Sequence, residues 1–376
     1  KILKRDMQEI LLGKSLEELQ IITQEIGLPR FAGKQLAEWL YVRRATTFDE
    51  MTNISLKGRE ALKTRYVIGR HKPVAEAISK DGTKKYLFEV IRDESLLQPL
   101  SAGKIESPRG EEAKYIEAVY IPENDRATLC VSTQAGCKMG CKFCMTGTLG
   151  FHGHLPAGEI LNQIFSIPDA NKLTNIVYMG EGEPMDNLDN VLRSLDVMTS
   201  SWGCAWSPKR ITVSSVGVLP ALKRYVEECE CHLAISLHNP FSIERKEVMP
   251  IERVHQLSSV ITLLKQYDWS KQRRVSFEYI CWGGRNDSIK HANELLKILK
   301  GLDCRINLIR FHASPMDKGD KQRTHNEALA FSSSNETQME WMRDYLTEHG
   351  ITTTIRRSRG EDILAACGML VNALKK

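Results

Sequence analysis

The sequence predicts an α/β protein: an open or partial (β/α) barrel, preceded by a small helical domain and a β-hairpin extension. Helical patterns occupy residues 1–73, a period of two follows in residues 74–126, and strand and helix patterns then alternate through residues 127–350. Residues 351–376 add a last strand, a cysteine-containing loop and a helix. Repeated β-then-α units of this length form a parallel sheet with right-handed crossovers.

Composition sets limits on the class of protein. The chain has 376 residues, 42% hydrophobic and 26% charged, which is enough for one large and one smaller domain. We find no apolar run of membrane-spanning length and no secretory signal. Ten unevenly clustered cysteines do not resemble an extracellular disulfide framework. We therefore expect a cytoplasmic protein without a membrane partner, and its net charge of +5 permits a nucleic-acid partner without requiring one.

The first predicted helix begins at a capping box, Ser15-Leu-Glu-Glu18, and ends at Gly27-Leu-Pro29. A second helix directs Leu36, Trp39 and Leu40 inward. The basic residues of this region fall on the remaining faces: Arg30, Lys34, Arg43, Arg44, Lys57, Arg59, Lys63, Arg65 and Arg70. A solvated helix face is the simpler interpretation of these charges, and RNA binding is the alternative.

The period then changes to two. Asp81-Gly82 is a hairpin signal, followed by a strand pattern over residues 85–90. Residues 92–112 are polar and contain prolines and glycines, which predicts a loop or an insertion. Residues 115–121 resume as a strand.

The barrel strands are predicted over residues 128–132, 175–179, 210–214, 232–237, 275–281, 305–311 and 352–355. Helical patterns lie between them, for example over residues 157–167, 188–200, 220–228 and 288–301. Ligands of such sheets bind at the carboxyl ends of the strands. We therefore expect a cofactor at the end of the first barrel strand.

Three cysteines with the spacing C-x3-C-x2-C follow that strand: Cys137, Cys141 and Cys144. They are badly placed for disulfides with one another and well placed to hold one inorganic group. Thiolates are the ligands of iron–sulfur clusters and of zinc, and three cysteines leave one iron of a [4Fe–4S] cube open. The alternatives are a zinc site that lacks a ligand and buried thiols in a core.

Other strand ends offer polar groups. The turn Met179-Gly-Glu-Gly-Glu-Pro184 follows the second strand, where its glycines let backbone carbonyls approach a ligand and Glu183 can pair with an ammonium group. Each such residue alone is more often a satisfied core polar group, but the shared position favours a ligand site. The candidates are Gly182, Glu183, Ser214, Ser236, Leu237, His238 and Asn307.

Two further cysteines are considered separately because of their positions in the chain. Cys130 lies on the first barrel strand, and Cys367 lies near the C-terminus. From the residues alone, packing and function are equally open for both. We interpret the others as packing or incidental thiols: Cys204, Cys229, Cys231, Cys281 and Cys304.

Taken together, these motifs resemble a known family. The C-x3-C-x2-C loop with an aromatic before its last cysteine is similar to the signature of radical S-adenosylmethionine (SAM) enzymes. The segment from Glu117 to Cys137, Ser-Leu-His238, Ile306-Asn-Leu-Ile309 and the Ala-Ala-Cys367-Gly tail resemble the RlmN/Cfr family of that class. The resemblance covers most of the chain. Glu181 departs from it, since the family usually has methionine there.

The resemblance implies a partial (β/α)6 radical SAM barrel and a [4Fe–4S] cluster on the three clustered cysteines. The SAM amino group would lie at the turn that contains Gly182 and Glu183. The implied reaction methylates C2 of an adenosine in 23S ribosomal RNA, and in some tRNAs, with adenine-C8 methylation of the Cfr type as the alternative. One SAM would methylate Cys367, and a second would yield a 5′-deoxyadenosyl radical. Glu117 would be the base for the C2 proton, and Cys130 would form a transient disulfide with Cys367 to release the product.

The same resemblance implies partners. These are 23S rRNA and tRNA, together with an electron donor such as flavodoxin or ferredoxin, and we expect a monomer. A buried adenine must leave its stack to reach such a site. We expect the basic N-terminal domain and Arg356, Arg357 and Arg359 to hold the flanking phosphates. An electron-transfer protein and a zinc-stabilised RNA-binding module are the alternatives from other classes.

Overall fold

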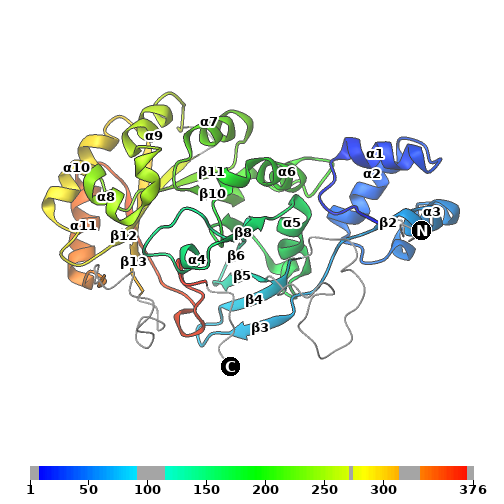
Figure 1. The fold of residues 1–376 in the computed structure, drawn as a ribbon, viewed down its shortest axis with the longest axis horizontal. Helices are drawn as coiled ribbons and strands as arrows, with labels where there is room; N and C mark the ends of the chain where they lie inside the picture. The colour runs from blue at the N-terminus through cyan, green and yellow to red at the C-terminus, as the bar shows by residue number, and fades with distance from the viewer. Residues whose placement is uncertain (1–7, 91–114, 271–273, 313–330, 371–376) are drawn as a thin grey trace, which may run out of the picture.

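The computed structural model describes residues 8–90, 115–270, 274–312 and 331–370 (Figure 1). One large mixed sheet forms its centre, with an arc of helices along it and a smaller helical group at the N-terminal end. The predicted loop or insertion at residues 92–112 lies outside the described residues.

The sheet has ten strands in the order β14-β13-β12-β11-β10-β9-β6-β5-β4-β3. The strands from β6 to β14 are parallel and stand side by side in chain order. Each coincides with a predicted strand, so the predicted α/β fold with consecutive parallel strands is confirmed. Their bounds are β6 (Ala127–Cys130), β9 (Asn175–Tyr178), β10 (Ile211–Ser215), β11 (His232–Ser236), β12 (Val275–Cys281), β13 (Cys304–Arg310) and β14 (Thr353–Arg356).

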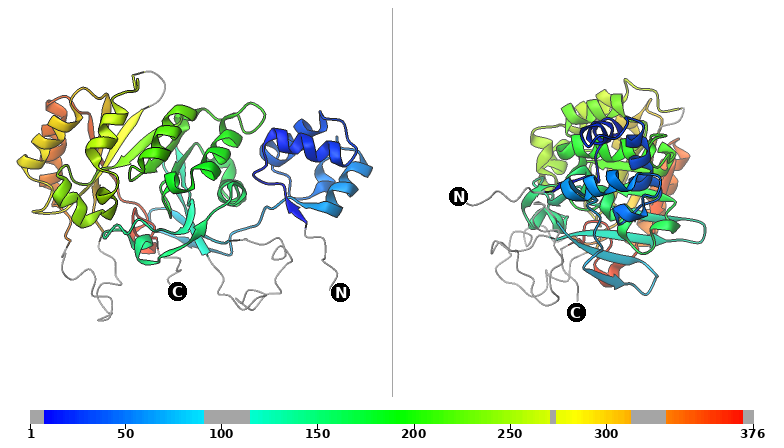
Figure 2. Two further views of the ribbon diagram at one scale, coloured as in Figure 1. Left: turned by 45° about the horizontal axis from the view of Figure 1, so that its top comes forward. Right: turned by 90° about the vertical axis from the view of Figure 1, so that its right-hand side faces the viewer.

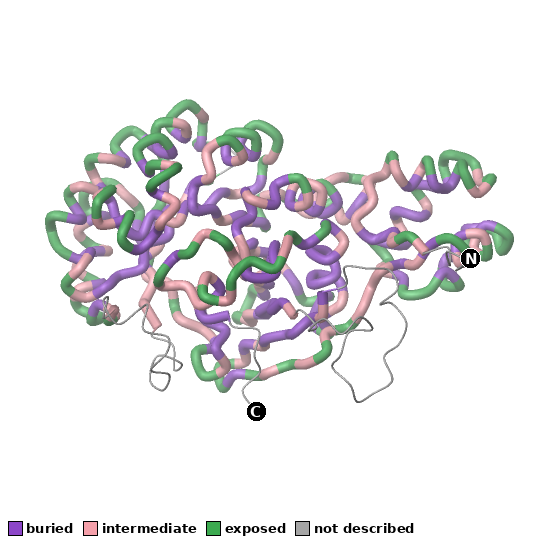
Figure 3. Tube along the Cα trace, in the orientation of Figure 1, coloured by how far each residue is buried: buried purple, intermediate pink, exposed green. Residues whose placement is uncertain are grey.

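The connecting helices form an arc along the sheet (Figure 1 and Figure 2). Helix α6 illustrates why they pack there, because Val191, Leu195 and Met198 lie on one helical face and are buried. The strands lie in the buried interior, whereas the outer helical turns are exposed (Figure 3). The bounds are α5 (Ala157–Ser166), α6 (Leu188–Thr199), α7 (Leu219–Glu228), α8 (Ser242–Val248), α9 (Leu257–Leu264), α10 (Ile289–Leu299) and α11 (Glu336–Glu348).

An antiparallel extension completes the sheet beyond β6. It consists of β5 (Tyr115–Pro122), β4 (Lys84–Glu89) and β3 (Ala75–Ile78). The turn between β3 and β4 contains Gly82 with a φ of 84°, and the Ser79 amide donates to the Thr83 carbonyl at 2.8 Å. The hairpin predicted at Asp81-Gly82 is therefore confirmed, and β5 joins it to the parallel strands.

The N-terminal region is mainly helical. Its first helix has the predicted capping box, in which the Ser15 amide donates to Glu18 Oε2 at 2.6 Å and the Glu18 amide donates to Ser15 Oγ at 3.2 Å. A short parallel pair, β1 with β2, was not predicted. The elements are β1 (Glu9–Ile10), α1 (Leu16–Glu25), α2 (Ala32–Ala37), a π-helix (Glu38–Val42), a 3-10 turn (Phe48–Glu50), α3 (Leu56–Arg65) and β2 (Tyr66–Val67).

The helical region packs directly on α5. A Cβ added to Gly158 would lie 2.4 Å from the Leu12 carbonyl oxygen, so the two backbones approach too closely for a side chain. Arg70 adds polar contacts, since its guanidinium donates to the Phe165 carbonyl at 2.6 Å and to the Arg44 carbonyl. The N-terminal region is thus fastened to the first helix of the barrel.

Short elements surround the cysteine loop and the tail. Strands β7 (Gln134–Gly136) and β8 (Phe151–His154) pair antiparallel on either side of α4 (Met145–Thr148). Single 3-10 turns occur at Ala170–Lys172, Pro184–Asn187, Pro208–Arg210, Pro250–Arg253 and Glu361–Ile363.

Across the described ranges, every helix is too short or too polar to cross a membrane.

Candidate active site

A cavity of about 1060 Å³ runs along the inner side of the parallel strands, and residues at both the amino-terminal and the carboxyl-terminal ends of these strands line it. Most of the predicted site residues line it: Cys130, Cys137, Cys141, Cys144, Gly182, Glu183, Ser214, Ser236, His238, Asn307 and Cys367. Leu237 and Glu117 are not among its lining residues. The structure thus brings together residues from β6, β10, β11 and β13, from the loops and turns that follow β7, β9 and β11, and from the C-terminal tail.

The three clustered cysteines lie in the loop between β7 and β8. Gly136 begins this loop with a φ of 70°, and a Cβ there would lie 1.9 Å from the Gly150 carbonyl oxygen. The Cys137 amide donates to that same carbonyl at 2.9 Å, which closes the loop. A glycine is therefore required immediately before Cys137.

The surroundings of these thiols are apolar. Cys141 packs in a buried cluster with Val216, Met249 and Trp282. Burial raises the pKa of the Cys137 thiol to about 12, and burial also raises the pKa values of Cys141 and Cys144, with the neighbouring thiols adding to the rise at Cys141. Three thiolates at this position need a positively charged partner, and cluster iron would meet that need.

Within the described ranges, no three His, Cys, Asp or Glu side chains converge as the ligands of a single metal ion would. A cubane cluster does not require such convergence, because each thiolate binds a different iron. The residues present therefore fit a [4Fe–4S] cluster with one iron left open.

The turn after β9 presents Glu183 to the cavity. Gly182 has a φ of 97°, and a Cβ there would lie 2.6 Å from Gln134 Cβ. The Glu183 carboxylate accepts hydrogen bonds from the amides of Met185 at 3.0 Å and Val216 at 2.9 Å. Burial nevertheless raises the pKa of this carboxyl to about 7. A cationic ligand such as an ammonium group would favour its charged form.

His238 is held in one tautomer. Its φ of 56° is left-handed, and its Nδ1 accepts the Ile280 amide at 3.1 Å, which leaves the hydrogen on Nε2. Burial lowers the pKa of the ring to about 3, so the imidazole is neutral. The ring packs edge-on against Phe143 of the cysteine loop, with 4.8 Å between centroids. The adjacent Leu237 is fully buried in the core, so only its backbone can serve a ligand.

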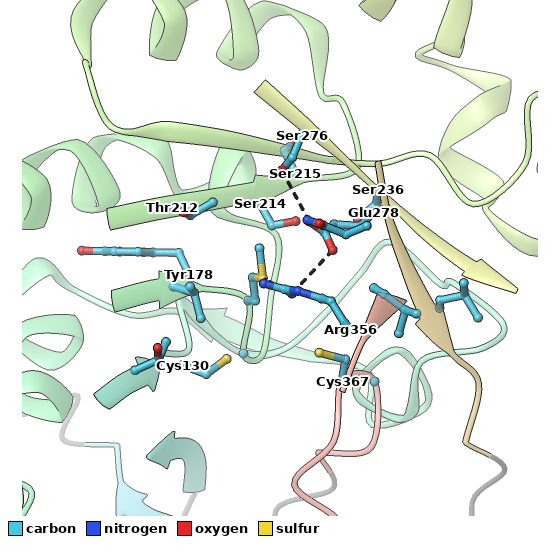
Figure 4. A pocket seen from close by; sticks show the side chains of 18 of the residues that line it. Cys130, Tyr178, Thr212, Ser214, Ser215, Ser236, Ser276, Glu278, Arg356 and Cys367 are labelled. Carbon is cyan, nitrogen blue, oxygen red and sulfur yellow. Dashed lines mark hydrogen bonds and ion pairs between the residues drawn. The ribbon is translucent and has the colours of Figure 1, made fainter. Parts of the chain in front are cut away.

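Cys130 and Cys367 face each other across the cavity, with Arg356 beside them (Figure 4). Burial raises the pKa of Cys130 to about 12, the Cys367 thiol adds to this rise, and Arg356 opposes it. Arg356 Nη1 lies 3.5 Å from Glu278 Oε2 and 3.6 Å from Met179 Sδ. The guanidinium is thus held between a carboxylate and the two thiols.

Two residues of β12 and β13 orient this arginine. Asn307 Nδ2 donates to Glu278 Oε1 at 2.8 Å, and Asn307 Oδ1 accepts from Thr354 Oγ1 at 2.8 Å. Glu278 was not predicted as a site residue. Its position in a strand of alternating pattern could have indicated that it faces the cavity, since Ser276 and Ile280 also line it.

Glu117 lies on β5 and is not one of the residues that line the cavity. Its carboxylate is fully buried and pairs with Lys85 Nζ at 2.8 Å, and its amide donates to Glu181 Oε1 at 2.9 Å. Val119 and Ile121, on the same face of β5, do line the cavity. The structure therefore places Glu117 one step further along that face, in an ion pair with a lysine that the sequence did not single out.

The arginines expected to hold phosphates lie in mixed settings. Arg356 faces the thiols, whereas Arg359 Nη1 lies 3.9 Å from Asp81 Oδ2. Several basic residues of the N-terminal region form ion pairs with nearby acidic residues. These pairs are Arg43 with Glu38, Lys63 with Asp49 and Arg65 with Glu25.

Comparisons with known proteins cover nearly the whole chain. Residues 10–68 match the family model of the ribosomal RNA large subunit methyltransferase N-terminal domain, and residues 131–297 match the radical SAM superfamily. A Bacteroides fragilis protein named probable dual-specificity RNA methyltransferase RlmN is 54% identical over 96% of both chains. A Bradyrhizobium protein named dual-specificity RNA methyltransferase RlmN is 38% identical over 97% of this chain and 89% of its own.

A solved structure shows the same fold. The crystal structure of a radical SAM methyltransferase from Sphaerobacter thermophilus has a TM-score of 0.82 and 33% identity, covering 97% of this chain and 100% of its own. The predicted radical SAM fold is therefore confirmed, and this superfamily generally uses SAM and a [4Fe–4S] cluster. The chain belongs to the RlmN family of radical SAM RNA methyltransferases.

Proposed function

We propose that this protein methylates C2 of an adenosine in 23S rRNA and in tRNA, and that it consumes two SAM molecules for each methyl group. The names of the relatives support an RNA substrate. The observation that carries the proposal is that Cys130 and Cys367 face each other in the same cavity that the three clustered cysteines line. A cluster protein that only transfers electrons has no use for this facing pair.

The cofactor would be held by Cys137, Cys141 and Cys144, with Glu183 as the partner for the SAM ammonium group. When bound, a [4Fe–4S] cluster supplies the single electron that splits SAM. The remaining SAM contacts would come from Ser214, Ser236, His238, Asn307 and the backbone of Leu237 and Gly182.

Cys367 would carry the methyl group. Its thiolate attacks the SAM methyl carbon, forms a carbon–sulfur bond and releases S-adenosylhomocysteine. Arg356 assists because a guanidinium beside the sulfur lowers the pKa of the thiol, against the rise caused by burial.

Product release requires a thiol and a base. The Cys130 thiolate would attack the sulfur of Cys367, so that a disulfide forms as the carbon–sulfur bond breaks. The electron pair of that bond stays on the carbon, which takes up a proton, and a reductant then returns the disulfide to two thiols. Glu117 would take the C2 proton. Because its carboxylate is buried and paired with Lys85 at 2.8 Å, that pair must open toward the substrate for the transfer.

The proposal also assigns the regions. Residues 1–73 would be an RNA-binding accessory domain, residues 74–126 a β extension, residues 127–350 the barrel, and residues 351–376 the segment that carries Cys367. The protein would act as a monomer that receives electrons from a donor such as flavodoxin or ferredoxin.

The decisive experiment is nucleoside mass spectrometry of unmodified 23S rRNA and tRNA after anaerobic incubation with reconstituted protein, SAM and a reductant. We expect 2-methyladenosine. A peak of 8-methyladenosine would instead assign adenine-C8 methylation of the Cfr type. SAM cleavage without any methylated adenosine would overturn the assigned substrate.

A matched pair of variants tests the roles of the thiols. Cys367→Ala should abolish methylation because no sulfur receives the methyl group. Cys130→Ala should accumulate protein covalently joined to RNA, because the bond to Cys367 is not released. Cys281→Ala, at a buried thiol of β12 that does not line the cavity, is the control and should retain activity.

A further inference from the structure

The cavity has a basic rim at the end opposite the clustered cysteines. We define this rim as Lys209, His232, Arg274 and Arg305. These residues lie at the amino-terminal starts of β10, β11, β12 and β13, four neighbouring strands. The strand register aligns them, because His232 pairs with Thr212 of β10, Arg305 pairs with Ser276 of β12, and the Arg274 amide donates to His232 Nδ1 at 3.1 Å. All four line the cavity that contains the facing thiols.

The three cations of the rim are exposed and, among the described residues, none makes an ion pair with a carboxylate. Asp303 is the carboxylate that lines the cavity beside them. Partial burial lowers the pKa of His232, and the nearby charges of Arg274, Lys209 and Arg305 lower it further. Because His232 Nδ1 accepts a hydrogen bond, its Nε2–H remains as a donor.

This arrangement contrasts with that of the N-terminal helices. There, Arg43, Lys63 and Arg65 are each paired with an acidic side chain. Positive charge that is already neutralised within the protein attracts little external anion. The rim is therefore better suited to an anionic ligand than those three cations are.

A polar strip joins the rim to the reacting thiols. Thr212, Ser214 and Ser276 point into the cavity between them (Figure 4). At ordinary strand spacing, four neighbouring strands span roughly 14 Å. That span exceeds what a single phosphate can contact, so the rim fits a chain with several phosphates better than it fits a small anion.

We propose that the rim binds the phosphodiester backbone of the RNA substrate beside the nucleotide whose base enters the cavity. The inference rests on the proposed function, since RNA is the polyanion that must present a base to the thiols. Lysine and arginine contacts to phosphate fix the register of a nucleic acid without reading its sequence. The rim would thus position the strand while the cavity receives the base.

The test is RNA binding by the full-length protein carrying Lys209→Ala, Arg274→Ala and Arg305→Ala. The Kd for unmodified tRNA transcript should rise about tenfold or more at low salt. The slope of log K against log salt should become shallower by about 2, because each lost phosphate contact contributes about 0.7–0.9. SAM cleavage in the absence of RNA should stay unchanged.

The matched control removes the same charge elsewhere, with Lys223→Ala, Lys290→Ala and Lys297→Ala on the outer helices α7 and α10. It should leave the salt slope unchanged, and an equal loss in the control would overturn the proposal. If the rim variant does not fold, Arg305→Gln alone should reduce the slope by about 0.7–0.9, and an unchanged slope would overturn it.

Two further outcomes separate this inference from other assignments. Loss of reduction by an acidic donor protein, with RNA affinity retained, would assign the rim to the electron donor and overturn the proposal. Because RNA binding is measured without catalysis, a wild-type protein that forms no 2-methyladenosine would defeat the proposed function while leaving the rim testable by its salt slope.

Discussion

Glu181 connects two parts of the site through backbone amides. Its carboxylate accepts the Glu117 amide at 2.9 Å and the Gly136 amide at 3.3 Å, and the side chain is almost fully buried. One amide belongs to the strand of the proposed base, and the other precedes the first clustered cysteine. The glutamate that this chain has in place of the family's methionine therefore bridges β5 and the start of the cysteine loop.

Glu181→Met should weaken that bridge. Leaving two buried amides without this acceptor should reduce the free energy of unfolding by about 2–4 kcal/mol. It should also raise the ratio of 5′-deoxyadenosine to methylated adenosine, because the two halves of the site are held less firmly. Glu159→Met, at a buried carboxylate that pairs with His71, should lower stability without changing this ratio. An unchanged ratio in Glu181→Met would show that the bridge has no role in positioning.

The raised pKa of Glu183 gives a pH prediction. Because the folded-state pKa of about 7 exceeds the ordinary value of 4.5, the proton stabilises the fold below pH 4.5, and this contribution is lost as pH rises through 7. The cost at pH 8 is on the order of 3 kcal/mol. Glu183→Gln should therefore gain stability relative to wild type between pH 5 and pH 8. Urea unfolding of the cluster-free protein measures the difference.

The exposed exchange Glu17→Gln is the control for that comparison, since Glu17 lies on the surface of α1. Its stability should follow wild type across the whole range. Parallel wild-type and Glu183→Gln curves would contradict the assignment of a raised pKa.

Residue-level contacts mark the limit of what the sequence could predict. The spacing of Cys137, Cys141 and Cys144 predicted a shared site, whereas roles for Cys130 and Cys367 were predicted only from the family resemblance. The pairing of Lys85 with Glu117 could not be predicted, since it depends on the register of β4 against β5. Similarly, Glu278 holds Arg356 only because β12 and β14 are each neighbours of β13.

At the scale of elements, the turn after β9 packs closely against β7 at Gly182. Gly182→Ala places a Cβ 2.6 Å from Gln134 Cβ at a φ of 97°. The turn must shift, so we expect a loss of stability of about 1–3 kcal/mol and a weaker affinity for SAM. Calorimetric titration of SAM and thermal unfolding provide the two measurements.

Gly301→Ala is the matched control for this turn. Gly301 has a φ of 80° but no atoms within 4 Å of the added Cβ. It should cost stability through backbone strain while leaving SAM affinity unchanged. Equal SAM affinity in Gly182→Ala and wild type would show that the turn does not position the ligand.

Elements were predicted well where the pattern is strong and local. The parallel strands and the helices α5, α6, α7 and α10 carry alternating or amphipathic runs, so their bounds agree within a few residues. The pairs β1–β2 and β7–β8 were missed. Each consists of strands of two to four residues, which are too short for a periodic signal.

At the scale of the whole molecule, Arg70 fastens the N-terminal region to α5. Arg70→Ala removes the hydrogen bonds to the Phe165 carbonyl at 2.6 Å and to Ser166 Oγ at 3.3 Å. Bonds from a charged donor contribute about 1.5–3 kcal/mol each, and partial exposure reduces this, so we expect a loss of about 2 kcal/mol. RNA turnover should fall while RNA-independent SAM cleavage is retained.

Arg30→Ala offers a comparison, because Arg30 is exposed and, among the residues that the structure describes, its side chain hydrogen-bonds within its own region, to Gln20 Oε1 at 2.9 Å. It should leave stability nearly unchanged. If Arg70→Ala turns over RNA as fast as wild type, the attachment of the N-terminal region to α5 does not matter for catalysis.

The tail that carries Cys367 rests on the loop that would hold the cluster. The Met145 amide, immediately after Cys144, donates to the Gly368 carbonyl at 2.8 Å, and Thr146 Oγ1 donates to the Leu370 carbonyl at 3.3 Å. Iron loss that loosens this loop would therefore also release the C-terminus. Limited trypsin digestion should cleave the tail faster in iron-free protein. A chain without its cluster would therefore also be degraded faster by cellular proteases.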